Sequence, residues 1–142
     1  MEPLVALIVG FLSARLAGLI GVEALDGWHP ALRVGLALLF VLTGISHFHP
    51  RLRPDIVGMV PPRLPRPDLL VTVTGALELL GAIGLLIPGL VSWAAVGLAL
   101  LMVGMFPANV SAARRQVAQG DPLGWRTVLQ LVYIAAAVLV AL

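Results

Sequence analysis

The stretch Leu69–Ile87 has the sequence LLVTVTGALELLGAIGLLI, apolar almost throughout and with one carboxylate, Glu78. As a helix rising about 1.5 Å per residue it would span roughly 28 Å, close to the thickness of the hydrocarbon core of a bilayer. Glu78 would then lie near the midplane, where an ionisable side chain is costly unless it is paired or neutral. The stretch therefore predicts a membrane-spanning helix.

The positions one helical turn from Glu78 carry small or hydroxylic side chains. Thr74, Gly75, Gly81 and Ala82 lie three or four positions away and would share its face. Small residues on one face of a membrane helix indicate close packing against another helix rather than against lipid. We therefore expect Glu78 to point into a helix bundle.

The whole chain has the composition of a membrane protein. It has 142 residues, of which 60% are hydrophobic and 11% charged. A soluble domain of this size could not bury so much apolar surface. Because the basic residues lie mostly in short connections between apolar segments, they do not indicate a nucleic-acid surface. The absence of cysteine excludes thiolate metal sites and a cysteine nucleophile in this chain.

Five apolar segments predict the architecture. The expected fold is an all-α membrane protein, a four-helix transmembrane bundle preceded by one extra N-terminal transmembrane helix, in one domain over residues 1–142. The N-terminus lacks the positive region of a cleaved signal peptide, so the first segment is expected to remain in the mature protein. The five predicted spans cover residues 4–24, 31–48, 69–87, 91–110 and 123–142.

The connections carry proline and arginine. Residues 49–68 contain six prolines and four arginines, and at that density proline predicts an extended, lip-like surface segment without a regular helix. Asp68 is expected to cap the following helix, Asp121 and Pro122 to begin the last one, and Pro107 to kink the fourth span. The 49–68 and 111–122 connections hold six arginines on one side, which by the positive-inside rule predicts a cytoplasmic N-terminus and an external C-terminus.

Polar side chains gather at the predicted cytoplasmic ends of the spans. Together with Tyr133 they would form a polar pocket that opens toward the 49–68 segment. The functional interpretation is a site for a small molecule or a proton, and the alternative is hydrogen bonding that only holds the helices together. The candidate binding residues are Thr43, His47, Thr74, Glu78, Asn109 and Gln130.

Arg15 and Glu78 are expected at similar depths from the cytoplasmic side. One interpretation is a buried ion pair that ties the first span to the third, and the alternative is an Arg15 side chain that reaches water on its own. His29, His47 and His49 do not share a helix face with carboxylates at ligand spacing, so no metal site is predicted. Ser46 and His47 diverge on a helix, so no catalytic residue is assigned.

Several runs of sequence resemble a known family. TGISHF (43–48), MVPP (59–62), the span 69–86 with Thr74-Gly75 and Glu78-Leu79, and FPANV (106–110) are similar to DoxX-like bacterial membrane proteins. The resemblance extends from about Arg33 to the C-terminus. It implies a four-helix core in the bacterial cytoplasmic (inner) membrane, with the first span as an extension. It also implies a link to membrane redox systems, because some members are named for a subunit of a thiosulfate:quinone oxidoreductase.

The leading functional hypothesis is an accessory or subunit of a membrane redox system that binds a hydrophobic small molecule such as a quinone, without a covalent cofactor. His47, Asn109 and Gln130 would hydrogen-bond the polar head of the ligand, and Glu78 would set the local charge or pass a proton. The alternatives are a proton-coupled small-molecule transporter and a purely structural interaction protein. Whether the chain is an enzyme stays open. The expected partners are membrane lipid, a redox protein and a second copy of the chain, and not nucleic acid.

Overall fold

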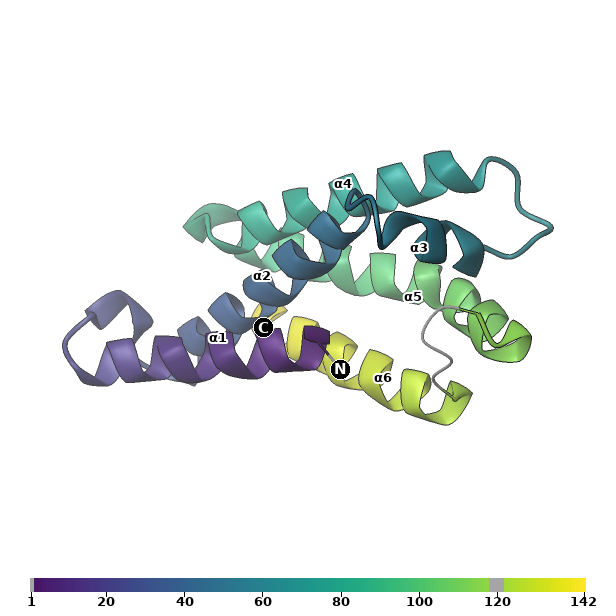
Figure 1. Cartoon of the computed structure of the whole chain (residues 1–142). Coiled ribbons are helices and arrows are strands. Elements are labelled where there is room, and N and C mark those ends of the chain that lie inside the picture. The colour runs from purple at the N-terminus through teal and green to yellow at the C-terminus, as the bar shows by residue number, and fades with distance from the viewer. Residues whose placement is uncertain (1, 118–121) are drawn as a thin grey trace.

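The computed structural model describes residues 2–117 and 122–142, which fold into helices (Figure 1). No strand occurs within these two ranges, so the predicted all-α class is confirmed. The α-helices are α1 (Glu2–Leu19), α2 (Trp28–Ser46), α3 (Arg53–Met59), α4 (Pro67–Leu85), α5 (Val91–Arg115) and α6 (Leu123–Ala141), with short 3-10 helices at Glu23–Leu25 and Pro88–Leu90.

Five of these helices, all except α3, are long and apolar enough to cross a membrane. Their outward faces carry large apolar side chains, among them Trp93, which is 80% exposed, and the exposed Leu100 and Leu131. An exterior of this kind suits lipid rather than water. The bundle is therefore that of a membrane protein, and the prediction of five spans is confirmed.

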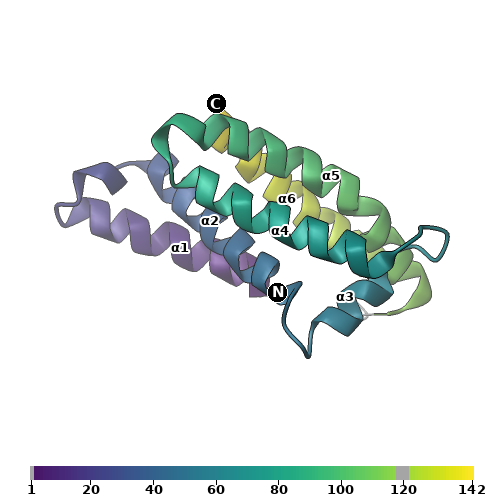
Figure 2. The ribbon, with the colours of Figure 1, turned by 90° about the horizontal axis from the view of Figure 1, so that it is seen from above.

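Four helices close into a ring. α2 packs on α4, α4 on α5, α5 on α6 and α6 on α2, while α1 packs along the outside of α2 (Figure 2). At one end, the His29 Nε2 lies 2.9 Å from the Val140 carbonyl oxygen, and the Ser92 hydroxyl donates to the Ala141 carbonyl at 3.0 Å. The predicted four-helix bundle with an additional N-terminal helix is thus confirmed, and its direction of insertion stays a prediction.

Glycines allow the closest helix approaches. A Cβ atom added to Gly10 of α1 would lie 2.7 Å from the Cα atom of Gly35 in α2. A Cβ atom added to Gly75 of α4 would lie 2.6 Å from the Cβ atom of His47. Gly75, Glu78 and Ala82 are all buried, so the packed face predicted around Glu78 is confirmed.

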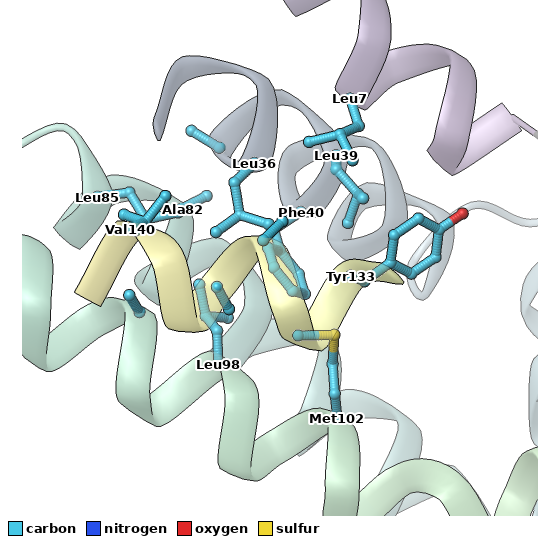
Figure 3. Close-up of a cluster of buried hydrophobic side chains, with 14 of the residues drawn as sticks. Leu7, Leu36, Leu39, Phe40, Ala82, Leu85, Leu98, Met102, Tyr133 and Val140 are labelled. Atoms are coloured by element: carbon cyan, nitrogen blue, oxygen red, sulfur yellow. The ribbon is translucent and has the colours of Figure 1, made fainter. Parts of the chain in front are cut away.

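An apolar core fills the half of the ring that lies away from the proline-rich segment. Its side chains come from all four ring helices and from Leu7 of α1, and Tyr133 borders them with its hydroxyl pointing away (Figure 3). The largest fully buried members are Leu36, Leu39, Leu85, Leu98 and Val140. This end of the bundle therefore holds the apolar core of the ring.

Several predicted boundaries were wrong. α1 ends at Leu19 and the chain turns through Gly21, whose φ of +121° suits glycine, so the first span is shorter than 4–24. Asp68 does not cap α4, because the helix already begins at Pro67, a first-turn position where the missing N–H of proline costs nothing. The fourth span was predicted to end at residue 110, but α5 continues through Pro107 to Arg115. Asp121 lies outside the described residues.

The expectation that the 49–68 segment has no regular helix was also wrong. α3 forms there because Pro54 occupies its first turn, where proline is tolerated. Arg53 anchors the start of α3: its Nη1 donates to the His47 carbonyl at 2.9 Å, and its Nη2 donates to the Asp68 carbonyl at 2.9 Å and to the Thr72 hydroxyl at 2.8 Å. These bonds tie α3 to the end of α2 and the start of α4.

Arg115 of α5 holds the other end of α3. Its Nη2 donates to the carbonyl oxygens of Gly58, Met59 and Val60 at 2.7, 3.3 and 3.3 Å. These are carbonyls of the last turn of α3, which a cation stabilises.

Replacing Arg115 by glutamine is expected to lower the free energy of local opening at this end of α3 by about 1 kcal/mol. The effect is modest because the contact is exposed to solvent. Faster amide hydrogen exchange over residues 58–66 would report it. Arg114→Gln, at the neighbouring exposed position, is the matched control. Equal exchange in both variants would show that Arg115 does not hold α3.

Candidate ligand-binding cavity

A cavity of about 710 Å³ lies between the ends of α2, α4, α5 and α6 that face the proline-rich segment. α3 and the first residues of α1 complete its wall. All six predicted binding residues line this one cavity: Thr43, His47, Thr74, Glu78, Asn109 and Gln130. The tertiary structure therefore brings together side chains that lie up to 87 positions apart in the sequence.

Most of the cavity wall is apolar. α3 and the turns around it contribute much of this surface, so the proline-rich segment forms one side of the cavity. The volume falls within the range of sites for small organic molecules. Apolar lining side chains include Leu42, Leu52, Ile56, Met59, Leu70, Met105 and Leu129.

His47 is buried at the end of α2, with only 5% of its surface exposed. Its Nδ1 lies 2.7 Å from the carbonyl oxygen of Thr43, one turn earlier in the helix. A carbonyl oxygen can only accept, so Nδ1 carries the hydrogen and donates it. The Nε2 atom is buried and has no hydrogen-bond partner among the described residues.

Glu78 lies beside His47 and is 4% exposed. Its Oε2 is 3.7 Å from His47 Nδ1 and has no hydrogen-bond partner in the described structure. Tyr133 of α6 is 9% exposed, and its buried hydroxyl is likewise unpartnered within residues 2–117 and 122–142. Leaving a buried polar group unpaired costs about 1–3 kcal/mol. The three atoms belong to side chains that line one cavity.

The other predicted residues already have protein partners. The Gln130 amide donates to the Met102 carbonyl, and Asn109 Oδ1 accepts from Arg126 Nη1 at 3.4 Å. The Thr74 hydroxyl donates to the Leu70 carbonyl at 2.9 Å within its own helix. These side chains shape the wall, whereas His47, Glu78 and Tyr133 each have one buried polar atom that makes no hydrogen bond to another described residue.

The predicted ion pair between Arg15 and Glu78 is not formed. Arg15 Nη1 lies 3.5 Å from Asp26 Oδ1, and the group near the Glu78 carboxylate is His47. The physical reason is that α1 packs on the outside of α2, so α2 separates Arg15 from α4. Similar depth along two helices does not bring side chains together when a third helix lies between them.

Three charged residues on the cavity wall were missed from the sequence: Glu2, Asp55 and Arg126. Arg126 could have been found, because it precedes Gln130 by one helical turn and shares its face. Asp55 could not, since it lies on α3 in a segment expected to be extended. Within the described ranges no group of three or more histidine, aspartate or glutamate side chains could hold a metal ion.

A family model described as "Domain of unknown function (DUF8561)" matches residues 36–141, about three-quarters of the chain. The chain belongs to this family. The matched DUF8561 region contains most of α2 and all of α3, α4, α5 and α6, hence nearly the whole ring and all six predicted binding residues, whereas α1 lies outside it. No curated protein and no solved structure matches the chain.

Proposed function

We propose that this protein binds a hydrophobic small molecule with a polar head, such as a quinone, as an accessory or subunit of a membrane redox system in the bacterial cytoplasmic membrane. The apolar wall would hold the body of the ligand and the polar wall its head. The observation that carries this proposal is a largely apolar cavity lined by His47, Glu78 and Tyr133, side chains that each have one buried polar atom without a hydrogen-bond partner among the described residues.

The purely structural alternative explains this arrangement poorly. Polar residues that only hold helices together are expected to bond to one another or to backbone groups, as Gln130 does. The redox assignment and the cellular location are supported by the resemblance of residues 43–48, 59–62, 69–86 and 106–110 to DoxX-like proteins, and by the concentration of arginines at the cavity end of the bundle.

A cavity-filling variant tests the proposal. Ala108 of α5 is half-buried and lines the cavity, so Ala108→Trp should occupy part of its volume and weaken binding of a decyl-substituted benzoquinone about tenfold or more. The purified full-length chain in detergent would be titrated with the quinone. Val103→Trp, on the exposed face of the same helix, is the control and should bind as the wild type does. Absence of saturable binding to the wild type would contradict the proposal.

Proton-coupled transport is the second candidate, because an acidic and an imidazole side chain lie 3.7 Å apart inside a cavity. It predicts that a ligand crosses a vesicle membrane in exchange for protons. Reconstituted protein that binds the quinone without moving protons or ligand across the vesicle membrane would favour the redox role.

A further inference from the structure

The wall of the cavity includes residues that lie outside the ring of four helices. We infer that the cavity opens sideways into the bilayer between α2 and α6, beside the first turn of α1, and that the tail of a bound ligand leaves through this opening. The inference rests on the proposed function. It narrows the ligand to molecules with a long lipid tail, whose head lies in the cavity while the tail stays among the lipids.

The first turn of α1 shows that the cavity reaches the outside of the ring. α1 packs along the outside of α2, yet Glu2 and Pro3 line the cavity. Leu42 of α2 also lines the cavity and is 38% exposed, so its side chain borders both the cavity and the exterior. A cavity enclosed by the four ring helices alone would not have residues of an outer helix in its wall. It therefore extends past α2 to the exterior.

The other three seams of the ring are held together at this end of the bundle. α2 and α4 are in close contact, since a Cβ atom added to Gly75 would lie 2.6 Å from His47 Cβ. α5 and α6 are bridged by the hydrogen bond from the Gln130 amide to the Met102 carbonyl. α3 lies against both α4 and α5, to which the arginine bonds described above hold it. The seam between α2 and α6 is the one at which the cavity meets α1.

α2 and α6 separate toward the cavity. At the opposite end they are joined where His29 Nε2 lies 2.9 Å from the Val140 carbonyl oxygen, and from there the two helices diverge (Figure 1). Ser46 lines the cavity on the α2 side of the seam, and Leu129 lines it on the α6 side. The cavity thus lies where this seam is widest.

The opening lies within the apolar spans. Leu42 is four residues before Ser46, the last residue of α2, and Leu129 is six residues after Leu123, the first residue of α6. At about 1.5 Å per residue these positions are roughly 6 and 9 Å inside helices long enough to cross a membrane. An opening at this depth faces lipid chains, so an apolar ligand can enter from the bilayer without crossing water.

The size of the cavity fits this arrangement. A volume of about 710 Å³ suits a small organic molecule, and it would hold a head group with the first part of a tail. A longer tail does not have to fit, because it can continue through the opening into the hydrocarbon of the bilayer. The site should therefore accept tails that are much longer than the cavity.

Protection of a single thiol tests where the tail lies. The chain has no cysteine, so the full-length Pro3→Cys variant in phosphatidylcholine nanodiscs carries one thiol only. Its rate of reaction with a membrane-permeant maleimide would be measured alone, with a geranylgeranyl-substituted benzoquinone, and with the methyl-substituted benzoquinone that has the same head. With each quinone at about ten times its dissociation constant, the long-tailed probe should slow the reaction about fivefold or more. The methyl probe should leave the rate unchanged.

Val5→Cys is the matched control, because Val5 lies two residues further along α1, is exposed and does not line the cavity. Neither probe should protect it. Leu42→Cys, on the α2 side of the opening, repeats the test if Pro3→Cys does not bind the probes.

Saturable binding of the long-tailed probe without protection of the thiol at the opening would overturn this inference and leave the proposed function standing. Equal protection by the two probes, or equal protection of Val5→Cys, would overturn it as well, since neither result places the tail in the opening. No saturable binding of either probe to wild type would overturn both the inference and the proposed function.

Discussion

Replacing Glu78 by glutamine is expected to weaken quinone or hydroquinone binding about 10- to 100-fold while the bundle stays folded. Glutamine keeps the volume of the side chain, so the packing of α4 against α2 is retained. It removes a carboxylate whose Oε2 is buried and has no hydrogen-bond partner within residues 2–117 and 122–142, and hydrogen bonds to charged groups contribute about 1.5–3 kcal/mol. The carboxyl group also contacts the Thr43 side chain and lies 3.7 Å from His47 Nδ1, contacts that the isosteric glutamine can largely keep, so we expect most of the loss to come from the ligand.

Mass spectrometry of small molecules that co-purify after mild extraction would measure the effect without assuming the ligand. Wild type should retain a defined amphiphile that Glu78→Gln loses. Glu23→Gln is the matched control, since Glu23 is exposed, lies between α1 and α2, and does not line the cavity. Only bulk lipid in all three proteins, with equal thermal stability, would leave the polar cavity without a ligand and favour a structural role for Glu78.

Replacing Gly75 by leucine is expected to destabilise the bundle by about 3 kcal/mol, enough to lower its thermal midpoint by several degrees. The added Cβ would lie 2.6 Å from His47 Cβ and 3.0 Å from Phe48 Cε2. A Cβ atom is fixed by the backbone, so relief requires α4 to move away from the end of α2. That shift would displace His47 and should abolish ligand binding as well.

Thermal unfolding in detergent would report the change in the thermal midpoint. It could be followed by circular dichroism or by loss of the monodisperse peak in size-exclusion chromatography. Gly97→Leu is the control, because a Cβ atom there meets no atom within 4 Å, and leucine favours a helix more than glycine does. Its midpoint should be unchanged or slightly higher. Equal midpoints for the two variants would mean that the close contact between α2 and α4 does not limit the stability of the fold.

Much of the cavity could be predicted because it depends on depth along helices. Thr43, His47, Thr74, Glu78, Asn109 and Gln130 were expected at one level, and the antiparallel helices bring them to one cavity. The prediction of an Arg15–Glu78 ion pair was wrong because the depth of a residue along its helix does not show which helices are neighbours. α3 was missed because proline density does not show that Pro54 falls in a first helical turn, where it is tolerated.

The class of protein, the number of long apolar helices and the packed face around Glu78 could all be predicted from the amino-acid sequence. These follow from the length and periodicity of apolar runs, which are local properties of the chain. The packing of α1 outside the ring, the hold of Arg53 and Arg115 on α3, and the lack of a described partner for His47 Nε2, Glu78 Oε2 and Tyr133 Oη became clear from the three-dimensional arrangement of the helices. Those features depend on which helices are neighbours and on the direction of individual side chains, which apolar periodicity does not encode.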